Sequence, residues 1–154
     1  MPSPASLRGH PIHSMLVVLP AGLWLFALVC DVVYVAHWGG EAWNSTALYA
    51  IGAGVVGALL AAVPGLIDLL SLHDHRVKRL GVFHMVINLV AVAVFAVNFG
   101  LRLDREAGVM PPIALTIVGV LLICVSGWLG GEMVYVHGVG VERSVPDRRP
   151  PSAA

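Results

Sequence analysis

Residues 80–102 constrain this chain most, because they are apolar enough to cross a bilayer yet carry a line of polar side chains. Steps of four and three place six positions on one face of a helix: His84, Asn88, Ala91, Phe95, Asn98 and Arg102. Polar groups at membrane depth cost free energy unless they face a protein interior and find partners there. Other parts of the chain must therefore supply those partners.

The first apolar run repeats the spacing of the third. His13 and Asp31 are 18 residues apart, and so are His84 and Arg102. This interval is about five helical turns, or roughly 27 Å. If both helices cross in the same direction, the histidines share one level and the charged groups share another. We predict an Asp31–Arg102 ion pair, with His13 and His84 as the functional pair.

Four apolar runs are long enough to span a bilayer, at about 14–36, 46–70, 80–101 and 112–136. The chain is 58% hydrophobic and only 12% charged, which excludes an ordinary soluble globular domain. We expect an all-α integral membrane protein, a four-helix up-and-down bundle in contact with the lipid bilayer. Residues 1–13 would form a polar cytoplasmic leader and residues 137–154 a mobile cytoplasmic tail.

The distribution of basic residues predicts the orientation. With four spans, both termini and the loop between spans two and three lie on one side. The opposite side holds only Arg102 and Arg105, whereas this side holds Arg8, Arg76, Lys78, Arg79, Arg143, Arg148 and Arg149. The positive-inside rule therefore predicts an inner-membrane protein with cytoplasmic termini. The formal net charge of zero gives no indication of a nucleic-acid partner.

A faint repeat relates the two halves of the chain. Spans one and three each have a histidine near the start, and spans two and four each have a carboxylate near the end. We therefore expect His13, Asp68, His84 and Glu132 to form one polar layer at the cytoplasmic side. His10 stands beside it in an H-x-x-H pair with His13. In the second span, Asn44 or Ser45 is expected to cap the helix.

Several short motifs occur together along the chain, namely GHPIH at 9–13, VPGLID at 63–68, His84 with Asn88, SGWLGGE at 126–132 and HGVGV at 137–141. Together they resemble a family of small bacterial and archaeal membrane proteins catalogued as domain of unknown function 2231. Ser14 departs from the proline that members often have there, which affects helix initiation more than chemistry. The resemblance implies no activity. Some relatives are joined to Rieske-type iron–sulfur domains, which implies electron transfer nearby.

The first functional hypothesis is binding of b-type haem for electron transfer. Histidines on two helices of a bundle can be the axial ligands of haem iron. His13 and His84 would ligate, with His137 as a substitute for His13. Arg76 and Arg79, with Lys78 between them, would reach the haem propionates. The electron partner would be quinone, or a Rieske-type or other redox protein.

The second hypothesis is a non-haem metal site for redox chemistry or metal transport. The polar layer of two histidines and two carboxylates, with His10 nearby, would suit iron, zinc or manganese. The third is a scaffold or partner subunit in which the layer is a hydrogen-bond network. A homo-oligomer stays open under each. The sequence has no nucleophile constellation, phosphate loop or dinucleotide motif, so a stand-alone enzyme is less favoured than an electron-transfer or metal-binding protein.

Overall fold

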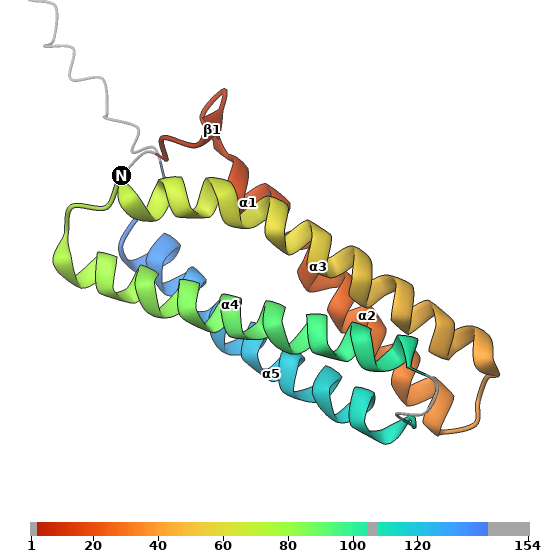
Figure 1. Ribbon diagram of the computed structural model, residues 1–154. Coiled ribbons are helices and arrows are strands. Elements are labelled where there is room, and N and C mark those ends of the chain that lie inside the picture. Colours follow the sequence, from red (N-terminus) through yellow and green to blue (C-terminus); the bar gives the residue numbers. More distant parts are fainter. Residues whose placement is uncertain (1–2, 105–107, 142–154) are drawn as a thin grey trace, which may run out of the picture.

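The protein is described by a computed structural model that covers residues 3–104 and 108–141 (Figure 1). Its helices are α1 Ile12–Leu16, α2 Val18–Val35, α3 Glu41–Leu70, α4 His75–Leu103 and α5 Met110–Gly131, which a π-helix, η1 Glu132–Val136, continues. Four helical segments are long and apolar enough to cross a membrane: Ile12–Val35, Glu41–Leu70, His75–Leu103 and Met110–Val136. The predicted all-α, four-span architecture is confirmed.

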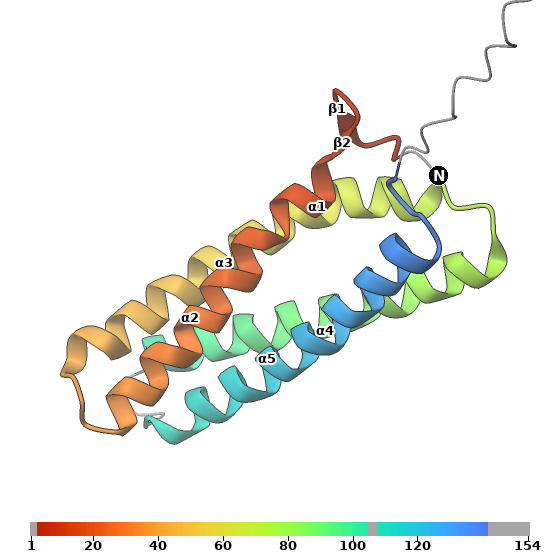
Figure 2. The same ribbon diagram turned by 180° about the vertical axis from the view of Figure 1, so that it is seen from behind.

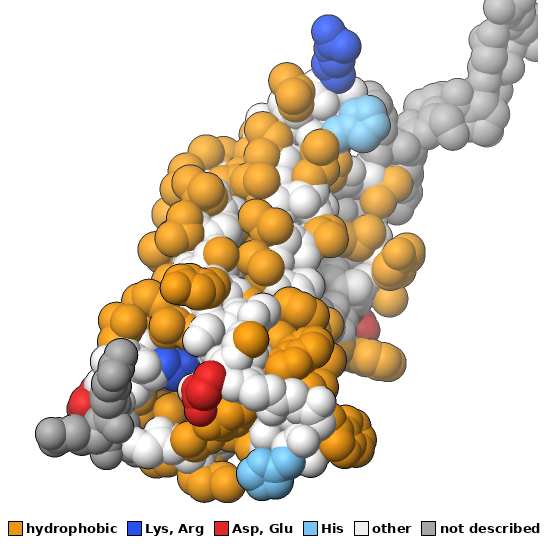
Figure 3. Space-filling model, turned by 90° about the vertical axis from the view of Figure 1, so that its right-hand side faces the viewer, with side chains coloured by type: hydrophobic (Ala, Val, Ile, Leu, Met, Phe, Trp, Pro, Cys, Tyr) orange, Lys and Arg blue, Asp and Glu red, His pale blue; other side chains and the backbone are white. Residues whose placement is uncertain are grey.

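The long helices run alternately up and down and close into a bundle. Helix α2 packs against α3 and α5, and α4 packs against α5 and α3. Figures 1 and 2 show the N-terminal segment and η1 at the same end of the bundle. Hydrophobic side chains cover most of the face drawn in Figure 3, as a surface in contact with lipid requires. The two hairpins, α1–α2–α3 and α4–α5, are the units that carry the site.

The helices extend beyond the predicted apolar runs. Helix α3 begins at Glu41 rather than near residue 46, and α4 begins at His75 rather than near residue 80. Hydropathy marks the part that crosses lipid, whereas capping groups decide where a helix ends. At α4 the carboxylate of Asp74 accepts hydrogen bonds from the backbone N–H groups of Arg76 and Val77, at 2.8 and 3.2 Å.

The N-terminal leader is ordered from Ser3 onward, which the sequence did not predict. Strands β1 Ser6–Leu7 and β2 His10–Pro11 form a small antiparallel hairpin. The two turn residues, Arg8 and Gly9, have φ angles of 51° and 82°, which match the twist that a tight hairpin needs. Part of the predicted tail is also in place, because Val139 packs against the buried cluster of Leu69, Leu72 and Val77. Residues 142–154 of that predicted tail lie outside the described residues.

Most of the buried core lies toward the end of the bundle opposite the N-terminal leader. At its centre Trp24 and Phe95 stack with ring centres 4.1 Å apart and planes 11° apart. The other buried members of this cluster are small or aliphatic: Ala27, Cys30, Ala47, Ala50, Ile51 and Val120. The stack therefore joins the two hairpins between the level of the histidines and the level of the ion pair.

The halves of the chain form a clear structural repeat. Three contacts cross between the hairpins, and the partners in each are 71 residues apart: His13 with His84, Trp24 with Phe95, and Asp31 with Arg102. Equivalent positions on the first helix of each hairpin thus meet face to face. The repeat that the sequence indicated faintly is a pseudo-twofold arrangement of the whole bundle.

The second helix of each hairpin repeats with a different offset, 65 residues. A Cβ at Gly54 would collide with the Trp24 ring, and one at Gly119 would collide with the Phe95 ring. One turn or more farther along, Gly65 lies against His13 and Gly130 lies against His84. Each hairpin therefore seats one aromatic ring and one histidine on glycines of its own second helix.

Candidate functional site

His13 and His84 face each other across the boundary between the hairpins. Their ring centres are 6.2 Å apart and their planes are at 86°. His13 is on the short helix α1 and His84 is in the third turn of α4; both side chains are half-buried. The structure thus brings together the two histidines that their spacing from Asp31 and Arg102 placed at one level.

Each histidine is oriented by a main-chain carbonyl of its own hairpin. The Nδ1 of His13 lies 2.8 Å from the Ala61 carbonyl oxygen, and that of His84 lies 2.9 Å from the Ser126 carbonyl oxygen. A carbonyl can only accept, so Nδ1 carries the proton in each neutral ring and Nε2 carries the lone pair. Metal-binding histidines are oriented in this way. Within residues 3–104 and 108–141, neither Nε2 has a hydrogen-bond partner.

The two histidines are not held equally. The hydroxyl oxygen of Ser126 lies 3.0 Å from the Nδ1 of His84, in addition to the carbonyl contact. The Asn88 amide donates to that hydroxyl at 2.6 Å and to the His84 carbonyl at 2.9 Å. Ala61 occupies the position equivalent to Ser126 beside His13, so it offers no hydroxyl. His84 is consequently the more firmly fixed member of the pair.

The predicted four-residue polar layer is not assembled. The Asp68 carboxylate instead accepts hydrogen bonds from the Ser3 hydroxyl at 2.6 Å and from the Ala5 N–H at 3.2 Å. Glu132 begins η1, and its side chain has no hydrogen bond or ion pair within the described part of the chain. His10 is exposed, with Nδ1 3.1 Å from the Arg8 carbonyl oxygen.

No three of the histidine, cysteine, aspartate and glutamate residues among 3–104 and 108–141 are grouped as metal ligands. The physical reason is that the ordered leader occupies the carboxylate of Asp68. A sequence reading that treats the leader as mobile leaves that carboxylate free.

The other predicted cofactor residues lie at the same end as the histidine pair but apart from it. Hydrogen bonds from the backbone N–H groups of Val77 and Arg76 lower the pKa of Asp74, and the nearby charge of His137 lowers it further. His137 therefore lies close to the α3–α4 connection. Arg76 and Arg79 are exposed on the first turns of α4. Arg79 precedes His84 by five residues, which is about 7.5 Å along the helix.

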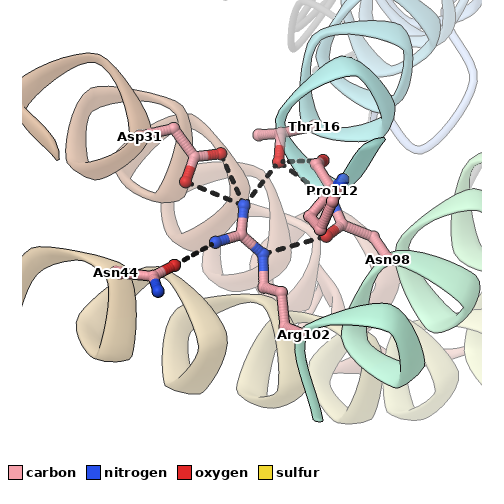
Figure 4. Close-up of polar contacts among 6 residues, drawn as sticks. All are labelled: Asp31, Asn44, Asn98, Arg102, Pro112 and Thr116. Carbon is pink, nitrogen blue, oxygen red and sulfur yellow. Dashed lines mark hydrogen bonds and ion pairs between the residues drawn. The ribbon is translucent and has the colours of Figure 1, made fainter. Parts of the chain in front are cut away.

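At the opposite end the predicted Asp31–Arg102 ion pair is confirmed (Figure 4). The Nη2 of Arg102 is 2.7 Å from each carboxylate oxygen of Asp31. The two side chains are only 4% and 1% exposed. Two charges so deeply buried stabilise each other only when their remaining hydrogen-bonding groups are also satisfied.

Three polar side chains complete this network. Arg102 donates to the Asn44 oxygen at 3.1 Å, to the Asn98 oxygen at 2.9 Å and to the Thr116 hydroxyl at 3.2 Å. Thr116 in turn donates to the Pro112 carbonyl oxygen and accepts from the Asn98 amide. The sequence indicated Asn98 but missed Thr116. Asn44 was expected as a helix cap, whereas Gly40 stands at the cap position and Asn44 faces the guanidinium.

A protein-family model described as "Predicted membrane protein (DUF2231)" matches residues 9–143 of the chain. No match was found among curated proteins or among solved structures. The match includes both histidines, the ion pair and the residues that surround them. It supports a membrane protein and names no ligand, partner or reaction.

Proposed function

We propose that this chain, which belongs to the DUF2231 family of predicted membrane proteins, binds b-type haem between His13 and His84 for electron transfer. One observation carries the proposal. Two histidines from different hairpins face each other, each with Nδ1 against a main-chain carbonyl and Nε2 left available. Haem iron in helical bundles takes axial imidazole ligands of this kind.

The separation of the rings is consistent with two imidazoles on one metal. Nitrogen–metal bonds to histidine are about 2.0–2.1 Å long for zinc, and iron is similar in size. Two such bonds and the two half-rings together account for most of the 6.2 Å between ring centres. Gly65 and Gly130 keep the second helices of both hairpins from crowding the rings.

The number of protein ligands favours haem over a non-haem metal. A macrocycle supplies four nitrogens itself, so the protein needs to add only two axial ligands. A zinc site needs three or four protein ligands. In the described residues, His13 and His84 form a pair without a third ligand residue grouped around them. Two facing histidines are therefore a complete ligand set for haem and an incomplete one for zinc.

Haem would supply one-electron redox chemistry, and the chain would hold and orient it. Arg76 and Arg79, at the same end as the histidine pair, carry the positive charge that suits the propionates. The electron partner would be membrane quinone or a soluble iron–sulfur protein.

We propose that this end of the bundle faces the cytoplasm, because basic residues are concentrated there. Reporter fusions at the C-terminus and at the α2–α3 connection test this. A phosphatase active only when exported should work at the connection and fail at the C-terminus. The reverse pattern would contradict the assignment.

The absorption spectrum of the detergent-purified protein tests the proposal, in the oxidised and the dithionite-reduced state. Cells supplied with haem should yield protein with the sharp reduced bands of a six-coordinate b-type haem. His13→Ala and His84→Ala should each abolish that spectrum. His73→Ala and His75→Ala, which alter exposed histidines at the same end, are the matched controls and should leave it unchanged.

Colourless wild-type protein from haem-supplied cells would discard the haem proposal. Metal analysis of the same sample then tests the alternative. Stoichiometric iron, zinc or manganese without haem bands, lost in His84→Ala, would support a non-haem site instead.

A further inference from the structure

Asp68 connects the N-terminal leader to the end of α3. One of its carboxylate oxygens accepts both the Ser3 hydroxyl and the Ala5 N–H. Hydrogen bonds to a charged carboxylate are the stronger kind, particularly where water is partly excluded. Asp68 and Ser3 are half-buried and Ala5 is buried. The leader is thus anchored at a defined point, about one helical turn from Gly65, on which His13 rests.

The anchor leads directly to His13. The Ala5 carbonyl oxygen accepts a hydrogen bond of 3.0 Å from the N–H of Ile12, the first residue of α1. His13 is the next residue. Asp68, Ala5 and Ile12 therefore form a continuous hydrogen-bonded path from α3 to the start of the helix that presents the histidine.

Helix α1 is joined to the membrane span at a weak point. It has only five residues, and α2 begins after Val17. Proline has no N–H, so Pro20 leaves the carbonyl of Leu16, the last residue of α1, without its helical donor. A helix segment ending at such a position can tilt at the cost of few hydrogen bonds.

His84 lacks this freedom. It lies in the third turn of α4, a continuous helix of 29 residues without proline. Ser126 contacts its Nδ1 with two oxygens, and Asn88 fixes the Ser126 hydroxyl. The same end also contains free volume beside the anchor. A cavity of about 400 Å³ is lined by Ser3, Pro4, Asp68, Ser71, Val139 and Gly140.

From these contacts we infer that Asp68 is a positioning residue for His13, which makes His13 the releasable and His84 the permanent member of the histidine pair. The inference rests on the proposed function in so far as the pair ligates haem. Releasing the leader would let α1 tilt and withdraw His13, and a haem held there would become five-coordinate on His84. That open position would take a small neutral ligand such as carbon monoxide.

Residue-resolved modification of histidines by diethyl pyrocarbonate, read by mass spectrometry, tests this on the full chain in detergent without requiring haem. In Asp68→Ala, His13 should react at least about tenfold faster than in wild type, the factor that corresponds to ~1.4 kcal/mol. The rate at His84 should not change. Exposed His73 and His75 serve as internal references.

Two further variants separate positioning from general destabilisation. Asp68→Asn keeps an acceptor oxygen for Ser3 and Ala5 and should remain near the wild-type rate. Asp74→Asn alters a neighbouring carboxylate that caps α4, and it should leave His13 unaffected.

Equal acceleration of His13 and His84 in Asp68→Ala, or no acceleration of either, would overturn the inference. Should that variant unfold, Ser3→Ala decides, since it removes one donor from the leader alone. It should accelerate His13 selectively, and an unchanged rate would overturn the inference.

Carbon monoxide added to the reduced protein gives the second readout. Asp68→Ala should show a bound-ligand spectrum that wild type lacks. Wild-type protein without haem would end the proposed function and leave the modification test intact. Haem in both proteins without a difference in carbon monoxide binding would instead count against the role of Asp68.

Discussion

The Nη2 nitrogen of Arg102 bridges both carboxylate oxygens of Asp31 at 2.7 Å, although the residues are 71 positions apart and belong to different hairpins. Asn44, Asn98 and Thr116 take up further donors of the same guanidinium. Every buried side-chain nitrogen and oxygen in the described residues has a hydrogen-bond partner. This network fixes the register between the hairpins at the end far from the histidines.

Replacing one charge of this pair should be strongly destabilising. Asp31→Ala should cost about 3–5 kcal/mol of unfolding free energy, because it leaves the Arg102 guanidinium buried and unpaired. Reversible unfolding in mixed micelles measures the change. Asp31→Ala with Arg102→Leu should cost less than the sum of the single changes. Strict additivity in that double-mutant cycle would show that the pair contributes no coupling.

The aromatic stack should be a second major contributor to stability. Phe95→Ala removes a fully buried ring that stacks on Trp24, and should cost about 3–5 kcal/mol. Phe83→Ala is the matched control, because Phe83 is 57% exposed on the same helix. The same micelle assay compares them. Similar losses for both variants would argue against the stack as the central contact.

The glycines behind the histidines should tolerate a methyl group to different degrees. A Cβ at Gly65 would lie 2.6 Å from the Nδ1 of His13, whereas one at Gly130 would lie 3.3 Å from the Cε1 of His84. Gly65→Ala should therefore displace His13 and lower haem occupancy, and Gly130→Ala should have the smaller effect. Absorbance at the haem band per protein measures occupancy. The opposite ranking would contradict this account of the seating of the rings.

The cap of α4 should make stability depend on acid pH. The pKa of Asp74 is lowered from its ordinary 3.8, mainly by the backbone N–H groups of Val77 and Arg76. A carboxyl whose pKa is lower in the folded state stabilises the fold above its ordinary pKa. That contribution is lost as the pH falls through the folded-state value.

Melting temperatures at neutral pH and near pH 3 measure this loss. Asp74→Asn, which can cap without titrating, should show a smaller drop between the two conditions than wild type. An identical drop in both proteins would assign the acid sensitivity to other groups.

The sequence predicted the levels of the key pairs because helical rise is fixed. The common interval of 18 residues placed His13 opposite His84 and Asp31 opposite Arg102. It could not identify Asn44 and Thr116, since those lie on the other two helices, whose rotation about their axes depends on packing. It also missed the role of Asp68, because that depends on a leader that folds through the turn at Arg8 and Gly9.

The repeat was faint in the sequence for a definable reason. Equivalent residues are 71 positions apart on the first helices but 65 apart on the second helices. The hairpin with α2 and α3 therefore has six more residues between equivalent points than the hairpin with α4 and α5. No single shift aligns both helices at once. Only the contacts of Gly54, Gly65, Gly119 and Gly130 show that the seating is repeated.

The repeat also has a consequence for biogenesis. Neither hairpin contains a whole site, since each supplies one histidine, one ring of the stack and one charge. Membrane helices insert first and associate afterwards, so insertion alone leaves two half-sites within the bilayer. The docking of the two halves creates the site, and a chain cut between α3 and α4 should regain it when its fragments are made together.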